Sequence, residues 1–197
     1  MSNGLKVQKR DGRVESIDLE KMHKMVDAAC EGLTGVSASQ VEIQSGIQFY
    51  DGITTAEIQE ILVKSANDLI SLENPNYQFV AARLLLFGLR KQLFGFSWDH
   101  PTLYAQIVRC IDWGVYDDSV LKNYTEEELN TIGEWIDHDR DLLFTFAGLS
   151  QVVDKYLVQD RSTKEVYETP QFMYMMIAIT IFADYDKDVR LSYIKRY

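Results

Sequence analysis

The chain of 197 residues is 46% hydrophobic and 12% aromatic, which suffices for a packed core and excludes disorder as the overall state. Its formal net charge of −10 argues against a general affinity for nucleic acid, because phosphates attract clustered cations. Two isolated cysteines, three scattered histidines and no apolar run of membrane-spanning length argue against a zinc site and a membrane anchor, and favour a cytoplasmic protein.

The N-terminal segment predicts a β-hairpin with a basic tip. Residues 5–10 and 13–17 alternate apolar and polar side chains, as half-buried strands do. Between them, Asp11-Gly12 predicts a two-residue turn in which both residues have positive φ. Three cations then lie close together at the tip, namely Lys9, Arg10 and Arg13.

Four helices are predicted to follow the hairpin and to complete a compact domain over residues 1–95. Side chains suited to capping mark the first three starts: Asp18, Ser37 with Gln40, and Thr54 or Thr55 with Glu57. The fourth helix ends at Gly95 and is apolar nearly all round, so we expect it to be buried between neighbours.

Residues 96–197 are predicted to form a second helical region. Helices are expected at 102–114, 125–136, 144–154, 170–183 and 187–197. Residues 156–168 alternate on both sides of a polar turn, which predicts one additional β-hairpin. The segment DHDRD (137–141) is interpreted as a solvated charged loop with an ion pair to Arg140 rather than as a metal or acid–base site.

Cations and a helix start in the first domain can form an anion site, because triphosphates need several cations and the free N–H groups of a helix N-terminus. The candidates for the phosphates are Lys9, Arg10, Thr55, Arg90 and Lys91, and those for a base and ribose are Glu15, Asp18 and Lys21. They would converge if the hairpin folds over the helices. The alternative is a solvated basic tip and a purely capping Thr55, and spacing alone favours that alternative.

The common phosphate loops GxxxxGK[ST] and GxGxxG do not occur in the sequence. Ser150, Cys30 and Cys110 have no sequence partner that suggests a nucleophile and its base. No catalytic residue and no metal ligand are therefore predicted.

Several long stretches resemble known domains. Three stretches resemble the ATP-cone, a small regulatory nucleotide-binding domain. They are VQKRDGRVESIDLEKMHKMVDAACEGL, FYDGITTAEIQEILVKSANDLIS and YQFVAARLLLFGLRK. Three later stretches resemble the N-terminal helical region of the large subunit of class I ribonucleoside-diphosphate reductase. They are YTEEEL, IDHDRD and KYLVQDRSTKEVYETPQFMYM. The resemblance implies a mainly α fold, in which a β-hairpin and four-helix cone precede a helical region with one further hairpin. It also implies an overall-activity switch in which ATP keeps the enzyme active and dATP inhibits it by changing subunit association.

The resemblance also implies a nucleotide site. Its residues would be Val7, Lys9, Arg10, Glu15, Ser16, Ile17, Asp18, Lys21, Thr55, Gln59 and Lys91. By position, the cations Lys9, Arg10 and Lys91 would hold phosphates with help from Thr55. The segment from Glu15 to Lys21 would cradle adenine and ribose, and Val7 would line the pocket. Many relatives carry histidine where this chain has Gln59 and Gly88, which leaves the strength of dATP inhibition open.

The implied effectors are ATP or dATP with Mg²⁺. The implied partners are the catalytic barrel of the large subunit, a radical-generating small subunit and further copies of the large subunit. Because two cysteines cannot supply the three thiols of the reductase mechanism, we expect the chain alone to be inactive, as a truncated piece or one part of a split subunit. The alternatives are a stand-alone ATP-cone sensor and a helical interaction module that binds no nucleotide.

Overall fold

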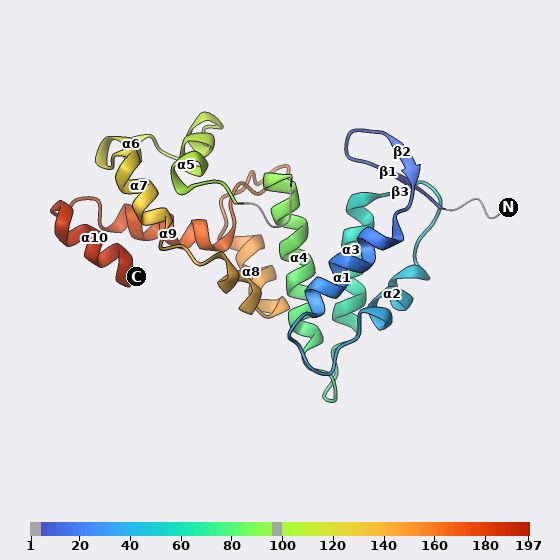
Figure 1. Cartoon of the computed structure of the whole chain (residues 1–197). Coiled ribbons are helices and arrows are strands. Elements are labelled where there is room, and N and C mark those ends of the chain that lie inside the picture. Colours follow the sequence, from blue (N-terminus) through green and yellow to red (C-terminus); the bar gives the residue numbers. More distant parts are fainter. Residues whose placement is uncertain (1–4, 96–99) are drawn as a thin grey trace. The chain divides into compact units, whose positions relative to one another are not determined.

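The structure, a computed structural model, describes residues 5–95 and 100–197. It divides the chain into two compact units (Figure 1). The first unit comprises the residues up to Gly88 together with Leu142–Ser150, and the second comprises Leu89–Asp141 and Gln151–Tyr197. Among the described residues, no helix has both the length and the apolar character needed to cross a membrane. The division into domains at residue 95 remains a prediction, and part of the joining segment, residues 96–99, lies outside the described residues.

The first unit combines a small sheet with the predicted helices (Figure 1). The sheet has the order β2-β1-β3, and its strands are β1 (Lys6–Gln8), β2 (Val14–Ser16) and β3 (Ile53–Thr54). The helices are α1 (Leu19–Cys30), α2 (Ala38–Gly46), α3 (Thr55–Asp68) and α4 (Tyr77–Phe94), the last of which continues into the second unit. Their apolar faces meet in a core of Val26, Ala29, Val41, Leu62, Ala66, Tyr77, Val80, Ala81, Leu84 and Phe87.

The hairpin turn differs from the prediction. The N–H of Gly12 donates to the carbonyl of Lys9 over 2.9 Å, so Arg10 and Asp11 are the central residues of the turn. Gly12 alone has a positive φ, of 82°, and the N–H of Lys9 closes the loop by donating to the carbonyl of Arg13 over 2.8 Å. This pattern is a turn followed by a glycine bulge, which needs one left-handed residue. The prediction that Asp11 also has a positive φ is therefore wrong.

Two of the three predicted caps in the first unit are confirmed. Asp18 accepts a hydrogen bond from the N–H of Lys21, and Thr54 with Glu57 forms a reciprocal capping box. At α2, however, Ser37 makes no side-chain cap. The amide oxygen of Gln40 accepts from the hydroxyl of Tyr77, which in turn accepts from the N–H of Ser37. The buried tyrosine thus takes the partners that the predicted box required.

The second unit is helical, as predicted. Its elements are α5 (Leu103–Asp112), α6 (Ser119–Asn123), α7 (Glu126–Gly133), most of a 3-10 helix (His138–Leu143), the end of α8 (Phe146–Lys155), α9 (Pro170–Ile181) and α10 (Lys187–Arg196). A capping box of Thr125 with Glu128 opens α7. The additional hairpin is a narrow loop closed by a single antiparallel bridge between Gln159 and Val166, rather than two strands.

The charged segment 137–141 is not solvated throughout. Asp141 and Arg90 are each only 1% exposed. Nη2 of Arg90 lies 3.6 Å from Oδ2 of Asp141 and donates to the carbonyl of His138 over 2.6 Å. The amide of Gln171 donates to Oδ1 of Asp141 over 3.0 Å. The exposed residues Asp137, Asp139 and Arg140 agree with the predicted loop, and Arg140 lies 3.8 Å from the carboxylate of Asp137. Arg90 is also withdrawn from the predicted phosphate contacts, because its guanidinium is buried beside Asp141.

Candidate nucleotide site

The sheet register brings the hairpin and the start of α3 together. β1 pairs in parallel with β3, with Val7 opposite Ile53 and Gln8 opposite Thr54. Parallel strands run in the same direction, so the residues that follow this pair, Lys9 and Thr55, leave the sheet at the same end. The register therefore brings residue 9 of the hairpin and the N-terminus of α3 to the same end of the sheet.

The sequence reasoning missed β3. The strand has two residues, and its hydrogen-bonding partner lies more than 40 positions earlier in the chain. The local signal was the β-branched pair Ile53-Thr54 directly after the turn residues Asp51-Gly52. This turn is tied to β1, because Asp51 accepts from the N–H of Lys6 over 2.9 Å and the N–H of Gly52 donates to the carbonyl of Lys6 over 2.9 Å.

The N-terminus of α3 has a donor available for an anion. In the capping box, the hydroxyl of Thr54 accepts from the N–H of Glu57 over 3.1 Å. The carboxylate of Glu57 accepts from the N–H of Thr54 over 2.8 Å. The box serves two of the N–H groups that have no partner within the helix, those of Thr54 and Glu57, and it leaves that of Ala56. With the positive end of the helix dipole, this N–H group favours an acceptor of negative charge.

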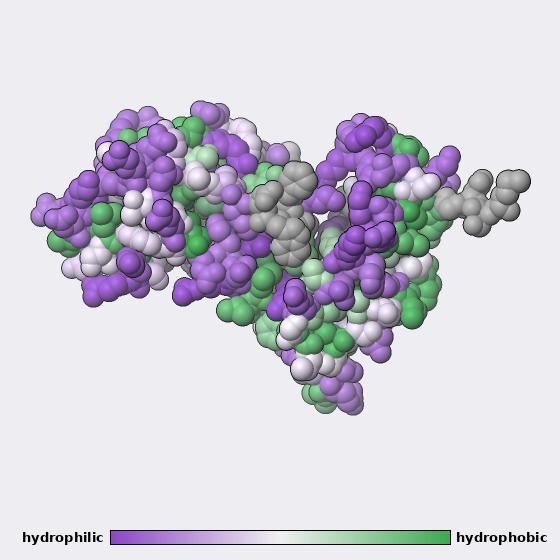
Figure 2. Space-filling model, in the orientation of Figure 1, coloured by the Kyte–Doolittle hydropathy of each residue, from purple (hydrophilic) through white to green (hydrophobic). Residues whose placement is uncertain are grey.

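The cations of the hairpin are partly neutralised. Nζ of Lys9 lies 2.8 Å from the carboxylate of Glu15, and Arg13 lies 2.7 Å from Asp11. The hydrogen bond from Lys9 holds the pKa of Glu15 below its usual value. Arg10 is exposed and has no ion pair with the described residues. The first unit is strongly hydrophilic in this region on the face that Figure 2 shows.

The predicted base and ribose segment lies at the junction of β2 and α1. Glu15 and Ser16 are exposed, Ile17 is half-buried, and Asp18 caps α1. The side chain of Lys21 returns to Asp18, with 3.5 Å between Nζ and Oδ2. The N–H of Lys21 donates to Asp18 and is the main cause that lowers the pKa of its carboxyl. The segment therefore presents charged groups near the hairpin cations, and its contacts to a base or ribose remain predictions.

Val7 and Gln59 have structural partners of their own. Val7 is 2% exposed between its strand partners Glu15 and Ile53. The amide of Gln59, on α3, donates to the carbonyl of Leu84 over 2.6 Å. Gln59 lies directly against Gly88 of α4, where a Cβ would come within 2.9 Å of Gln59 Cγ. The roles of Val7 and Gln59 toward a nucleotide are thus still predictions.

Lys91 lies in the last turn of α4, in the part of that helix that belongs to the second unit. Its approach to Lys9 and Thr55 therefore remains a prediction. A hollow of about 640 Å³ on the first unit shares only Leu19 and Glu20 with the predicted base and ribose segment from Glu15 to Lys21, and its lining contains none of the predicted phosphate contacts. Its residues are Leu5, Leu19, Glu20, Met22, His23, Glu42, Ile43, Gly46 and Phe49.

Comparison with known families identifies both parts of the chain. Residues 5–92 match the ATP cone domain, and residues 142–196 match the ribonucleotide reductase all-alpha domain. The chain therefore combines an ATP cone with a reductase all-alpha domain, as the resemblance in the sequence indicated.

Individual relatives give the same assignment over the whole chain. The chain is 49% identical to ribonucleoside-diphosphate reductase 1 subunit alpha of Salmonella typhimurium and 48% identical to that of Escherichia coli, over all 197 residues in each case. It is 38% identical to the subunit alpha of Enterobacteria phage T4 over 195 residues. Over its whole length the chain is thus similar to the N-terminal region of ribonucleoside-diphosphate reductase alpha subunits. It spans 26% of the length of the two bacterial relatives.

Proposed function

We propose that the chain is the allosteric portion of a ribonucleoside-diphosphate reductase large subunit, which binds ATP or dATP and sets the overall activity of the enzyme. The observation that carries this proposal is the register of β1 with β3, which brings Lys9 and the N-terminus of α3 to the same end of the sheet within the residues that match an ATP cone. A basic side chain beside free helix N–H groups suits a phosphate chain.

In this proposal Lys9, Arg10 and Lys91 hold the phosphates, while Thr55 and the N–H of Ala56 add hydrogen bonds. Glu15, Ser16, Ile17, Asp18 and Lys21 surround adenine and ribose. Mg²⁺ would enter with the nucleotide, since it keeps several waters and is commonly bound through the phosphates themselves. The ion pair of Lys9 with Glu15, at 2.8 Å, would hold the lysine near the phosphates before they arrive.

The whole enzyme would reduce ribonucleoside diphosphates together with the rest of the large subunit, a small subunit and further copies of the large subunit. This chain alone is expected to give no turnover. Its thiols, Cys30 on α1 and Cys110 on α5, are unpaired, and burial raises the pKa of each to about 11. Neither is therefore an activated thiolate, and free thiols suit the reducing cytoplasm in which we place the protein.

Calorimetry with ATP and dATP in Mg²⁺ buffer tests nucleotide binding. We expect saturable binding by the chain and its loss in the double variant Lys9→Ala, Lys91→Ala, because each change removes a cation from the phosphates. The matched control is Lys24→Ala with Lys64→Ala, which removes two exposed lysines that pair with Glu20 and Asp68. If the unaltered chain takes up neither nucleotide, the helical interaction module becomes the better description.

The helix start can be tested separately. Thr54→Ala removes the capping box of α3 and should lower the free energy of unfolding by about 1 kcal/mol. It should also weaken ATP binding, because the N–H groups of the first turn lose their fixed direction. Thr125→Ala removes the equivalent box of α7, with a similar loss of stability and unchanged ATP affinity. Denaturant unfolding measures the stability of both variants, and calorimetry measures their affinity for ATP. An equal loss of ATP affinity in the two variants would contradict the proposed position of the phosphates.

A further inference from the structure

Helix α9 has an apolar stripe that faces outward. Its twelve residues, PQFMYMMIAITI, include no charged side chain, and such a helix is normally covered on all sides. Phe172, Met173, Ala178 and Ile179 are buried within the second unit. On another face Tyr174 is 38% exposed, Ile177 37% and Ile181 58%. Their spacing of three and four residues aligns them in one stripe along the helix.

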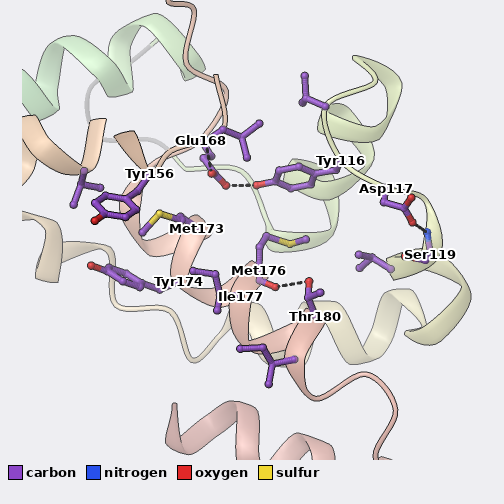
Figure 3. Close-up of a pocket in the computed structure, with 15 residues that line it drawn as sticks. Tyr116, Asp117, Ser119, Tyr156, Glu168, Met173, Tyr174, Met176, Ile177 and Thr180 are labelled. Carbon is purple, nitrogen blue, oxygen red and sulfur yellow. Dashed lines mark hydrogen bonds between the residues drawn. The ribbon is translucent and has the colours of Figure 1, made fainter. Parts of the chain in front are cut away.

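This stripe borders a hollow of about 680 Å³ within the second unit, which we call the α9 groove. Figure 3 shows Met173, Met176 and Ile177 of α9 between Tyr156 on one side and Tyr116 on the other. The groove is lined by Val115, Tyr116, Asp117, Ser119, Val120, Val152, Tyr156, Val158, Glu168, Met173, Tyr174, Met176, Ile177, Thr180 and Ile181. Most of these side chains are apolar or aromatic.

Glu168, Thr180 and Asp117, three polar residues of the groove, have hydrogen-bond partners within the unit. Glu168 is 1% exposed and accepts hydrogen bonds from the hydroxyl of Tyr116 (Figure 3) and from the N–H of Val158, the latter over 2.8 Å. The hydroxyl of Thr180 donates to the carbonyl of Met176 over 2.8 Å, and Asp117 accepts from the N–H of Ser119 over 2.8 Å. An occupant of the groove therefore meets mainly hydrocarbon and gains little from charge or hydrogen bonds.

We propose that the α9 groove is the surface on which the remaining part of the reductase large subunit docks. This inference rests on the proposed function, because it takes the chain as a portion of such a subunit. The relatives are almost four times as long as the chain, and the groove lies mostly within the residues that match the reductase all-alpha domain. A largely apolar groove whose buried carboxylate, that of Glu168, is satisfied internally is typical of a permanent interface, whereas transient partners usually meet more polar surfaces.

Side-chain labelling tests this docking. The matching quarter of the Escherichia coli alpha subunit is replaced by this chain, and hydroxyl-radical labelling is compared between the chimera and the isolated chain. We expect labelling of Tyr156 and Tyr174 to fall about fivefold or more in the chimera, because the packed core of an interface excludes water. Tyr50 and Tyr185, which are 51% and 49% exposed outside the groove, serve as references.

A pair of variants tests the same surface. Ile177→Asp places a charge in the groove and should abolish the protection of Tyr174 in the chimera. Ile47→Asp, at a position 81% exposed on the first unit, should leave it unchanged. Both variants should bind ATP like the unaltered chain, so loss of nucleotide binding with a protected groove would contradict the proposed function alone. If Ile177→Asp does not fold, the comparison of the unaltered proteins decides.

Three results would overturn the docking proposal. The first is equal labelling of the groove tyrosines in the chimera and the isolated chain. The second is protection that grows with the concentration of the isolated chain, which would assign the groove to a second copy. The third is protection that needs the small subunit. If the chimera is insoluble, the two pieces are produced together as separate chains, and unprotected groove tyrosines there count equally against the proposal.

Discussion

Replacing Arg90 by methionine should lower the free energy of unfolding of the second unit by about 3–5 kcal/mol, the usual cost of leaving one partner of a buried ion pair alone. The guanidinium of Arg90 is buried 3.6 Å from the carboxylate of Asp141 and donates to the carbonyl of His138. Without it, the carboxylate keeps only Gln171 as a hydrogen-bond partner among the described residues. Urea unfolding of the variant and the unaltered chain measures the difference.

The loss of stability caused by Arg90→Met should depend on pH. Burial raises the pKa of Asp141 to about 6 from an ordinary 3.8. A carboxyl with a raised pKa contributes stability that is present below about pH 4 and lost as the pH rises through about 6. Arg90→Met should therefore cost more at pH 8 than at pH 5, where the carboxyl is largely protonated. A penalty that grows on acidification would contradict this account of the pair.

The stability contributed by the neighbouring imidazole of His138 depends on pH in the opposite direction. Burial lowers the pKa of His138 to about 3, so its contribution is present above pH 6.5 and lost as the pH falls toward 3. Between about pH 4 and 6, the fall in stability with rising pH due to Asp141 and the rise due to His138 offset each other in the unaltered chain. The variant Asp141→Asn should expose the slope of His138, with stability falling as the pH is lowered.

Two control variants separate charge from packing. Arg140 pairs with Asp137 at the surface, so Arg140→Met should change stability by less than about 1 kcal/mol. The double variant Arg90→Met, Asp141→Leu removes both charges and should recover most of the loss. If the double variant is as unstable as Arg90→Met alone, the loss comes from packing and not from the unpaired carboxylate.

Gly88→Ala should destabilise the first unit by about 1–3 kcal/mol, the typical cost of one extra group in a packed contact. A Cβ at position 88 would lie 2.9 Å from Cγ and 3.2 Å from Cδ of Gln59. Gln59 cannot simply swing away, because its amide donates to the carbonyl of Leu84 over 2.6 Å. The contact therefore opposes the gain of about 1 kcal/mol that alanine brings to a helix interior.

A double-mutant cycle measures this contact. Gln59→Ala removes the obstructing side chain, so the penalty of Gly88→Ala should be smaller by at least about 1 kcal/mol in its presence. Gly46→Ala, in α2, is the matched control, because a Cβ there meets no heavy atom within 4 Å. It should leave stability unchanged or slightly raised. Simple additivity of the changes at positions 59 and 88 would contradict the steric explanation.

Features that depend on neighbouring residues were predictable from the sequence. Asp18, Thr54 with Glu57, and Thr125 with Glu128 cap their helices as expected, because each cap is a set of bonds between residues three apart. Ser37 with Gln40 has the same sequence pattern but forms no capping box. The hydroxyl of Tyr77, far along the chain, bonds both residues, and no local pattern reveals that competitor.

The candidate site was predictable in part for the same reason. Lys9 and Thr55 were recognisable as a cation and a helix start, whereas the strand pairing that joins them is a contact between distant residues. Arg90 was misassigned because it is adjacent to Lys91 in sequence. Adjacent residues on a helix project about 100° apart, so one can be buried beside Asp141 without fixing the direction of the other.

The raised pKa values of the two cysteines make the protein convenient for selective chemistry. With a pKa of about 11, Cys30 and Cys110 are ionised at neutral pH in only about one molecule in ten thousand. A cysteine introduced at an exposed position such as Ile47 has an ordinary pKa and a far larger reactive fraction. A maleimide dye or spin label should therefore react with that new cysteine much faster than with either native thiol.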